Sequence, residues 1–516
     1  MTESKTPRSN IFSKIILETT VFVCGALVMI YEIIGSRLLS PYLGASTYVW
    51  TSLIGVILAA LSLGYWLGGK IADRRPEIKV LAFVIFLAGG LVSVTIFSKD
   101  IILSIIARSA FILEVKTLIA ALLLFAPASV LLGFVTPYAV KLKMSSLEDA
   151  GKTVGRLYAL STVGSILGTF LAGFFLIPFV GSTRTLYLIA ACLISLSLLL
   201  VPFALSLFNL MVLIFFALAV TANELKDLYL LHKNDLHDID TEYSRVQVFK
   251  TTDANTKKEI RAIATDPFFI QTGMFLDSDE LVFPYAEYYH LLRHFKPNFE
   301  KTLMIGGAGY SFPKAYLQTY KTAEMDVVEI DPQMTEIARR FFRLQDDTRL
   351  QIFHQDGRIF LNQAEPSQYD AVLMDAFGSL FSIPFQLTTI EAVQKINRVL
   401  KDDGVVIFNL VSAIEGDANR FLQAEMKTYR QVFPQVFLFK INAHYEDNRV
   451  QNLIIVASKN KNSASLISED TRINFLLNHL YKEKLESEIE VLTDDLAPVE
   501  FYNSFGQSVY RSTLAD

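Results

Sequence analysis

Seven long apolar segments in the first 222 residues constrain this chain more than any other feature. They cover residues 16–36, 48–70, 80–97, 117–136, 157–180, 184–204 and 206–222. Each is long enough, or nearly so, to cross a bilayer as a helix. The amphipathic stretch 100–115 provides a short eighth crossing despite Arg108. The sequence therefore predicts a multi-span α-helical membrane domain over residues 1–225, with seven or eight spans.

The basic residues of this half indicate its orientation. They cluster before the first apolar segment, after the second and after the fourth: Lys5, Arg8 and Lys14; Arg74, Arg75 and Lys79; Lys141, Lys143, Lys152 and Arg156. Because cytoplasmic loops of membrane proteins are rich in Lys and Arg, these clusters predict a cytoplasmic N-terminus. Seven crossings from a cytoplasmic N-terminus would place the second half of the chain outside the cytoplasm. An eighth crossing, or a region 184–222 that does not cross twice, would instead place the second half in the cytoplasm. We therefore expect a multi-pass protein of the inner (plasma) membrane with a cytoplasmic second half.

No cleavage-site pattern follows the first apolar segment, so we expect a retained span and not a signal peptide. Two ionisable residues lie in or beside this segment. Glu32 is within the segment and Arg37 is at its exit. Ionisable groups at membrane depth usually face a partner or a cavity. One interpretation is a pair that fixes helix packing, and the other is a polar route for a small molecule. The second interpretation keeps a membrane transporter or sensor open as an alternative function.

The composition becomes mixed and polar after Ala222, where a second part of the chain begins. Residues 226–300 predict a small β-rich lead-in, with short strands at 243–249, 260–264 and 268–271. An aromatic, helix-like stretch then follows over 279–294, and its polar members are Tyr285, Tyr288, Tyr289 and His290. Aromatic residues at this density either form core or line a pocket.

The stretch 302–357 has the order of a nucleotide-binding βαβ unit. An apolar strand at 303–305 leads into a loop with Gly306, Gly307 and Gly309. A helix is expected over 312–320, and a second strand at 325–330 carries Glu329 near its end. Glycines let the backbone approach a ligand closely, and an acid at that strand tip can accept both ribose hydroxyls. The pattern predicts a nucleoside-binding, Rossmann-like domain over residues 301–516.

Two further strand ends add acidic residues to this predicted site. A third strand at 351–354 is followed by Asp356 and Gly357, where an acid can accept a hydrogen bond from an adenine amino group. A fourth strand at 369–374 delivers Asp375. Because ligands of open α/β sheets bind at the carboxyl ends of the strands, Asp375 is the best candidate for a catalytic or substrate-orienting carboxylate. Strands at 405–409 and 453–457 complete a sheet of about seven strands.

Charge and cysteine content exclude several classes of function. The net charge is −5 and no long basic run is present, so nucleic acid is not an expected partner. Cys24 and Cys192 both lie in apolar segments, so we expect neither a disulfide framework nor a thiolate metal site. The sequence shows no zinc-type spacing, and we expect a small-molecule substrate and no metal.

The second half of the chain resembles the spermidine synthase (polyamine aminopropyltransferase) family, whose domain has a methyltransferase-type Rossmann-like fold. The resemblance covers residues 240–460. It extends to the motifs YEIIGSRLLSPYLG (31–44), GYWLGGKIADR (64–74), GRLYALSTVGSILGT (155–169) and LTDDLAPVE (492–500). The whole chain therefore resembles the membrane-integrated branch of that family.

The resemblance implies roles for the candidate site residues. An S-adenosylmethionine-type substrate would be bound by Gly306, Gly307, Gly309, Glu329, Asp356, Gly357, Gln271 and His290. Among these, Glu329 would bind the ribose, Asp356 the adenine and Gln271 the tail. Asp375 matches the family's catalytic aspartate, which orients or deprotonates an attacking amine. Tyr285 and Tyr289 would help Asp375 to hold the reacting tail.

Two glycines depart from the family pattern. The family's glycine loop carries an acid where this chain has Gly309, and the family carries a second acid three residues after its catalytic aspartate, where this chain has Gly378. Those acids hold the ammonium groups of decarboxylated S-adenosylmethionine and of a diamine acceptor. Asp494 and Asp495 are candidate replacements.

Three reactions consequently remain open for this chain. Aminopropyl transfer to an amine and an S-adenosylmethionine lyase reaction that gives homoserine lactone would both release methylthioadenosine. A methyltransferase reaction would release S-adenosylhomocysteine instead. The substrate is accordingly either S-adenosylmethionine or its decarboxylated form, and the resemblance also implies a possible homo-oligomer.

Overall fold

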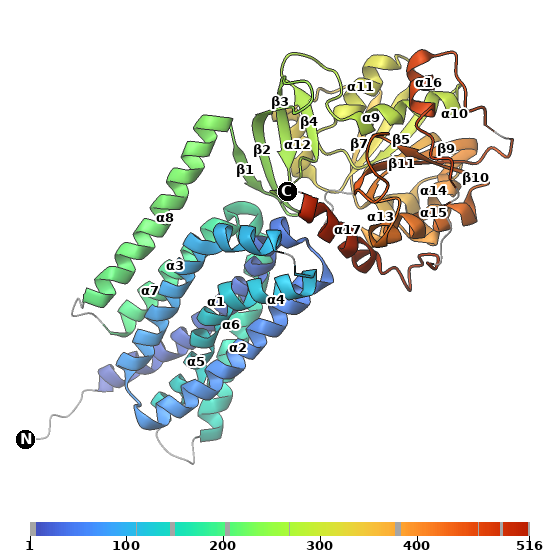
Figure 1. The fold of residues 1–516 in the computed structure, drawn as a ribbon. Coiled ribbons are helices and arrows are strands. Elements are labelled where there is room, and N and C mark those ends of the chain that lie inside the picture. Colours follow the sequence, from blue (N-terminus) through green and yellow to red (C-terminus); the bar gives the residue numbers. More distant parts are fainter. Residues whose placement is uncertain are drawn as a thin grey trace, which may run out of the picture. The chain divides into compact units, whose positions relative to one another are not determined.

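The computed structural model describes residues 7–109, 111–144, 150–201, 207–267, 269–376, 383–462, 464–483, 485 and 489–513. The chain divides into a helical unit, Met1–Lys233, and a mixed α/β unit, Asn234–Asp516 (Figure 1). Each unit has its own buried core, and the α/β unit contains the site described below.

The helical unit consists of long apolar helices. They are α1 (Pro7–Leu43), α2 (Thr47–Arg74), α3 (Ile78–Arg108), α4 (Leu113–Leu124), α5 (Ala126–Lys143), α6 (Ala150–Leu171), the π-helix η1 (Ala172–Val180), α7 (Ser182–Leu200) and α8 (Leu207–Asn234). Among the described residues, six helices are long and apolar enough to cross a membrane. The number rises to seven if α4 and α5, which meet at an angle of 55°, count as one span.

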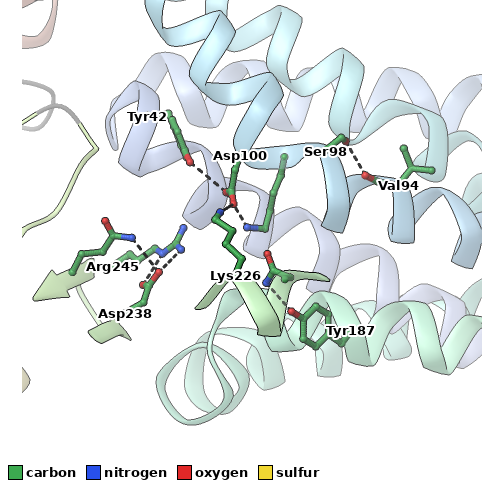
Figure 2. A network of polar contacts seen from close by, with 11 residues as sticks. Tyr42, Val94, Ser98, Asp100, Tyr187, Lys226, Asp238 and Arg245 are labelled. Atoms are coloured by element: carbon green, nitrogen blue, oxygen red, sulfur yellow. Dashed lines mark hydrogen bonds and ion pairs between the residues drawn. The ribbon is translucent and has the colours of Figure 1, made fainter. Parts of the chain in front are cut away.

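Two polar clusters mark opposite ends of the helical unit. At the first end, Glu18 near the start of α1 pairs with Arg156 of α6, with 2.8 Å between Oε1 and Nε. At the second end, Asp100 of α3 accepts hydrogen bonds from Tyr42 of α1 (3.3 Å) and Lys226 of α8 (2.6 Å), as Figure 2 shows. Both α1 and α8 therefore have their C-terminal parts at the second end.

The other helices alternate between these two ends. At the first end, Asp73 of α2 pairs with Lys141 of α5 (2.7 Å), and Ser197 of α7 donates a hydrogen bond to the backbone of α3. At the second end, Asn223 of α8 donates to Tyr187 near the start of α7 (2.7 Å). With α4 and α5 taken together, the described chain passes between the ends seven times. It leaves this unit at the end opposite the start of α1.

The break between α4 and α5 leaves a carbonyl group that side chains satisfy. Pro127 lies in the first turn of α5, where it has no backbone N–H to donate. The Leu124 carbonyl accepts hydrogen bonds from the Tyr31 hydroxyl (2.8 Å) and the Thr95 hydroxyl (2.9 Å). An unpaired carbonyl would be costly in an apolar bundle, so these two bonds stabilise the bend. Glu32, one residue after Tyr31, is also buried.

Two expectations for this half are wrong. The stretch 100–115 is not a separate crossing, because α3 continues to Arg108 and α4 begins only at Leu113. The charged pair inside α3 does not end the helix, since Lys99 and Asp100 bond to each other and Asp100 has further partners. The second part of the chain also begins later than residue 225, because α8 continues to Asn234.

The α/β unit opens with a four-stranded antiparallel sheet. Its strands, in spatial order, are β1 (His237–Asp240), β2 (Arg245–Thr252), β3 (Glu259–Ala264) and β4 (Thr272–Phe275). The strand expected at 268–271 is displaced, because Asp266 and Phe269 pair with each other in a tight reversal and pairing with β3 resumes at Thr272. The sequence did not predict β1.

The main sheet has seven strands in the order β10–β11–β9–β8–β5–β6–β7. Their bounds are β5 (Lys301–Ile305), β6 (Glu324–Glu329), β7 (Leu350–His354), β8 (Tyr369–Met374), β9 (Leu400–Ser412), β10 (Gln435–Lys440) and β11 (Gln451–Ser458). Strands β5 to β9 are parallel, whereas β10 and β11 are antiparallel additions at one edge. This arrangement confirms the predicted Rossmann-like fold of the methyltransferase type.

Short helices cover both faces of the main sheet. They are α9 (Pro284–Glu287), η2 (Tyr288–Leu291), α10 (Leu292–Phe295), α11 (Ser311–Thr319), α12 (Pro332–Phe341), α13 (Gly357–Gln363), η3 (Phe385–Leu387), α14 (Ile390–Val399), η4 (Asp417–Asn419), α15 (Arg420–Val432), α16 (Thr471–Leu477) and α17 (Val499–Thr513). Each face has a separate apolar cluster, which fixes the strand ends where the site lies.

Candidate functional site

The site lies where the strand order of the main sheet reverses. Strands β5 and β8 are parallel neighbours, and Ile305 is paired with Met374 at their carboxyl ends. The Asp375 backbone N–H donates to the Ile305 carbonyl (2.9 Å), so the loop after β5 and the loop after β8 start together. Gly306 has φ +98°, and a Cβ there would lie 2.3 Å from the Asp375 carbonyl oxygen. Only glycine fits this crossing, at the point where α/β sheets bind ligands.

A pocket opens at this reversal point. The pocket together with the open solvent at its mouth occupies about 620 Å³. Its lining comes from both sheets and the helices between them: Phe269, Gln271, Thr272, Tyr285, Ala286, Met304, Gly307, Ala308, Ser311, Phe312, Asp375, Asn409, Val411 and Asn452. The pocket thus brings together four residues predicted from the sequence, namely Gln271, Tyr285, Gly307 and Asp375.

Asp375 is held by a line of amide side chains. Asn409 Nδ2 donates to Asp375 Oδ1 (3.0 Å), and Asn452 Nδ2 donates to Asn409 Oδ1 (3.0 Å). Burial raises the pKa of Asp375 to about 6, and contacts with Asn409, Tyr289 and Tyr285 oppose that rise. Sequence analysis missed both asparagines. Asn409 ends the predicted strand 405–409, so a polar residue at a strand's carboxyl end was the available signal.

The two tyrosines expected beside Asp375 are there. Burial raises the pKa of the Tyr285 and Tyr289 hydroxyls well above the ordinary value, and Asp375 adds to both effects. Tyr289 is fully buried, and its hydroxyl lies beside Asp375 although the residue does not line the pocket. The Gln271 side-chain oxygen is buried without a partner in the described chain, and Gln271 does line the pocket. Buried polar atoms normally have partners, so the Gln271 oxygen marks where a polar ligand would bind.

Glu329 holds the glycine loop. Its Oε2 accepts from the Gly307 N–H (2.9 Å) and the Ala308 N–H (3.1 Å), and its Oε1 accepts from the Asp331 N–H (3.0 Å). Burial raises the pKa of Glu329, although these three bonds oppose the rise. The carboxylate therefore shapes the loop that lines the pocket. Its contact with a ribose stays a prediction.

Asp356 and Gly357 form the start of α13. Asp356 Oδ1 caps the helix by accepting from the Arg358 and Ile359 N–H groups (2.8 and 3.0 Å). A Cβ on Gly357 would lie 2.8 Å from Ile305 Cγ2, so glycine lets α13 pack against β5. Neither residue lines the pocket, and their adenine contact stays a prediction.

His290 occupies a different place from the one expected. Its Nδ1 pairs with the Tyr320 hydroxyl (2.7 Å), and its ring packs edge-on against Phe312. Burial lowers the pKa of His290 to about 3, with Arg472 and Arg293 adding to the effect. His290 is thus a neutral residue of the layer behind the pocket and is absent from its lining.

The described pocket lining contains no replacement for the two family acids. A Cβ on Gly309 would lie 2.7 Å from Thr272 Cγ2, so an acid does not fit there without movement. Gly378 lies outside the described residues. Asp494 is bound by Arg358 and Thr389, both at 2.6 Å, and does not reach the pocket lining.

Comparison with known proteins gives a consistent family match. Residues 283–463 match the family described as spermine/spermidine synthase domain. A polyamine aminopropyltransferase of Vibrio vulnificus is 32% identical over 176 residues, which is 33% of this chain and 57% of that protein. This chain therefore spans little more than half of that relative.

Two other similarities differ in extent. Polyamine aminopropyltransferase 1 of Streptomyces coelicolor is 23% identical over 421 residues, 77% of this chain and 75% of that protein. This alignment extends beyond the α/β unit into the helical unit. A crystal structure of a probable spermidine synthase from Corynebacterium glutamicum is 19% identical with a TM-score of 0.39, over 45% of this chain and 82% of that one.

Proposed function

This chain belongs to the spermine/spermidine synthase family through residues 283–463, and on that premise we propose that it transfers an aminopropyl group from decarboxylated S-adenosylmethionine to an amine. The products are the alkylated amine and methylthioadenosine. The observation that carries this proposal is Asp375, a buried carboxylate fixed by Asn409 at the reversal point of the sheet and open to the pocket.

The geometry supports one displacement step. The amine nitrogen attacks the aminopropyl carbon on the sulfonium, so a C–N bond forms and the C–S electron pair stays on sulfur. The proton lost by the nitrogen passes to Asp375. Because burial raises the pKa of Asp375 to about 6, the carboxylate is ionised at neutral pH yet basic enough to take that proton.

The charge of the pocket favours the decarboxylated donor. Among the described residues that line the pocket, none is Lys or Arg. The carboxylate of intact S-adenosylmethionine would therefore be buried without a cationic partner, which is costly. The Gln271 side-chain oxygen, which belongs to the pocket lining and has no partner among the described residues, can accept a hydrogen bond from the aminopropyl ammonium.

One observation favours a second candidate reaction. The family's acid, which disfavours a donor that keeps its carboxylate, is absent because this chain has Gly309 at that position. The packing of Thr272 against Gly309 also leaves little room for an acidic side chain there. An intact S-adenosylmethionine could then react with its own carboxylate to give homoserine lactone and methylthioadenosine. This lyase reaction needs no acceptor, which separates it from the first proposal.

Mass spectrometry of the purified full chain distinguishes the candidates. The chain is incubated with the intact or the decarboxylated donor, each with and without a mixture of amines. Methylthioadenosine that forms from the decarboxylated donor only when amine is present supports the transferase. Methylthioadenosine with homoserine lactone from the intact donor alone selects the lyase, and S-adenosylhomocysteine would instead indicate methyl transfer.

We also propose that the helical unit crosses a membrane seven times. The apolar helices support this location, and the alternation of their ends supports an odd number of crossings. An odd number separates the N-terminus from the α/β unit, so the two cannot both be cytoplasmic as the sequence suggested. Reporter fusions at residues 1 and 234 test this: opposite sides are expected, and the same side would refute seven crossings.

A further inference from the structure

The pocket contains a single negative charge. Asp375 is the one carboxylate among the described residues that line it. The other polar side chains of the lining are neutral, and several already bond to each other. Asn452 bonds to Asn409, and the Thr272 and Ser311 hydroxyls lie 3.1 Å apart. A second ammonium group would therefore find no anionic partner on the described walls.

The nearby acids of the chain do not supply that partner. Asp494 is neutralised by Arg358, and Asp266 is buried but does not line the pocket. Glu329 is also outside the lining, and its two oxygens accept three backbone hydrogen bonds. Residues 377–382 lie outside the described chain, and their sequence, FGSLFS, contains no acidic residue. A diamine with both ends charged would have to bury one unpaired ammonium, which is costly in a pocket of this kind.

The walls suit an apolar body instead. Phe269, Tyr285, Phe312, Met304 and Val411 line the pocket. Phe269 and Val411 pack on an apolar cluster of Ala413, Ala418 and Val450, which fixes that wall. Aromatic and aliphatic side chains in this arrangement bind a flat or branched hydrocarbon group and exclude water from the reacting nitrogen.

Resting on the proposed transferase function, we infer that the acceptor is a monoamine with an aromatic or aliphatic body. Its nitrogen lies at Asp375, which takes the proton released when the new C–N bond forms. Its body lies against Phe269 and Val411. The sulfonium donor supplies the aminopropyl group, and its sulfur leaves with the C–S electron pair as methylthioadenosine.

The test compares acceptors of similar size with the decarboxylated donor and the full chain. We expect kcat/KM for 2-phenylethylamine to exceed that for putrescine at least tenfold, measured as methylthioadenosine release with the alkylated amine identified by mass. Putrescine as the better acceptor would overturn the inference but leave the transferase intact. If none of the amines gives an alkylated product, both the inference about the acceptor and the proposed transferase function are overturned.

A change of wall charge provides a second test. Val411→Asp places a carboxylate on β9, the neighbouring strand, two residues after Asn409, and Val411→Asn is its neutral control of equal size. We expect Val411→Asp to raise kcat/KM for putrescine relative to 2-phenylethylamine at least tenfold, and Val411→Asn to leave the ratio unchanged. Equal ratios in both variants would show that wall charge does not select the acceptor.

Discussion

Replacing Asp375 by Asn is expected to abolish turnover and also to stabilise the α/β unit at neutral pH. Burial raises the pKa of this carboxyl group from the ordinary 3.8 to about 6. Between these two values the folded chain binds more protons than the unfolded chain. The free energy of unfolding of the wild type therefore falls as the pH rises through this window.

The size of the effect follows from the pKa values. Each pKa unit corresponds to about 1.4 kcal/mol, so the wild type should lose about 3 kcal/mol of stability relative to Asp375→Asn between about pH 3 and pH 8. The Asn side chain stays uncharged over this range, and its oxygen can still accept the bond from Asn409. The variant thus isolates the cost of burying the charge.

The assay is urea unfolding of the full chain in detergent at a series of pH values. Near-ultraviolet circular dichroism follows the buried aromatic residues, which include Tyr289, Tyr310, Tyr316 and Tyr369 of the α/β unit as well as Tyr31 and Tyr138 of the helical unit. Asp402→Asn, which changes an exposed carboxyl group, is the matched control. A stability gap between wild type and Asp375→Asn that does not change with pH would refute the reasoning, whatever its sign.

Three further changes test the parts around Asp375. Asn409→Leu removes a bond that opposes the raised pKa of Asp375, so the acidic limb of the kcat/KM profile should move up by roughly one pH unit; a uniformly lower rate with an unmoved limb would contradict this. Gly309→Ala should cost about 1–3 kcal/mol in urea unfolding, and adding Thr272→Ser, which removes the crowded methyl group, should recover most of it; no recovery would place the strain elsewhere. Glu329→Gln should loosen the glycine loop by about 2 kcal/mol, raising KM for the donor with little change in kcat; an unchanged KM would separate Glu329 from donor binding.

Much of the fold could be predicted because its signals are local. The glycine loop, the apolar strands and the acids at their ends occur in a fixed order, and the structure places that order at the reversal point of a seven-stranded sheet. Asp375 and Gly307 meet in the pocket because parallel strand ends share one edge. The long apolar segments of the first half also predicted most of its helices, because length and composition are local properties of the sequence.

The remaining features depend on contacts that local patterns do not encode. Asn452 reaches the site from an antiparallel edge strand, and its role becomes visible only when its partner Asn409 is in place. His290 faces the layer behind the pocket because Tyr320, 30 residues later, accepts or donates its hydrogen bond. The stretch 100–115 was expected to be a separate crossing, whereas α3 continues through Asp100 to Arg108 and Lys226 from a distant helix bonds to Asp100.

The two asparagine side chains that hold Asp375 limit the routes by which a proton can reach or leave its carboxylate. An amide side chain neither gains nor loses a proton near neutral pH, so Asn409 and Asn452 orient the carboxylate but cannot conduct a proton into the sheet. In the proposed transfer, a proton that Asp375 receives would leave either through the pocket or through the Tyr285 and Tyr289 hydroxyls beside it. Departure through the pocket would couple recovery of the base to departure of the alkylated amine, whereas departure through the tyrosines would separate the two events.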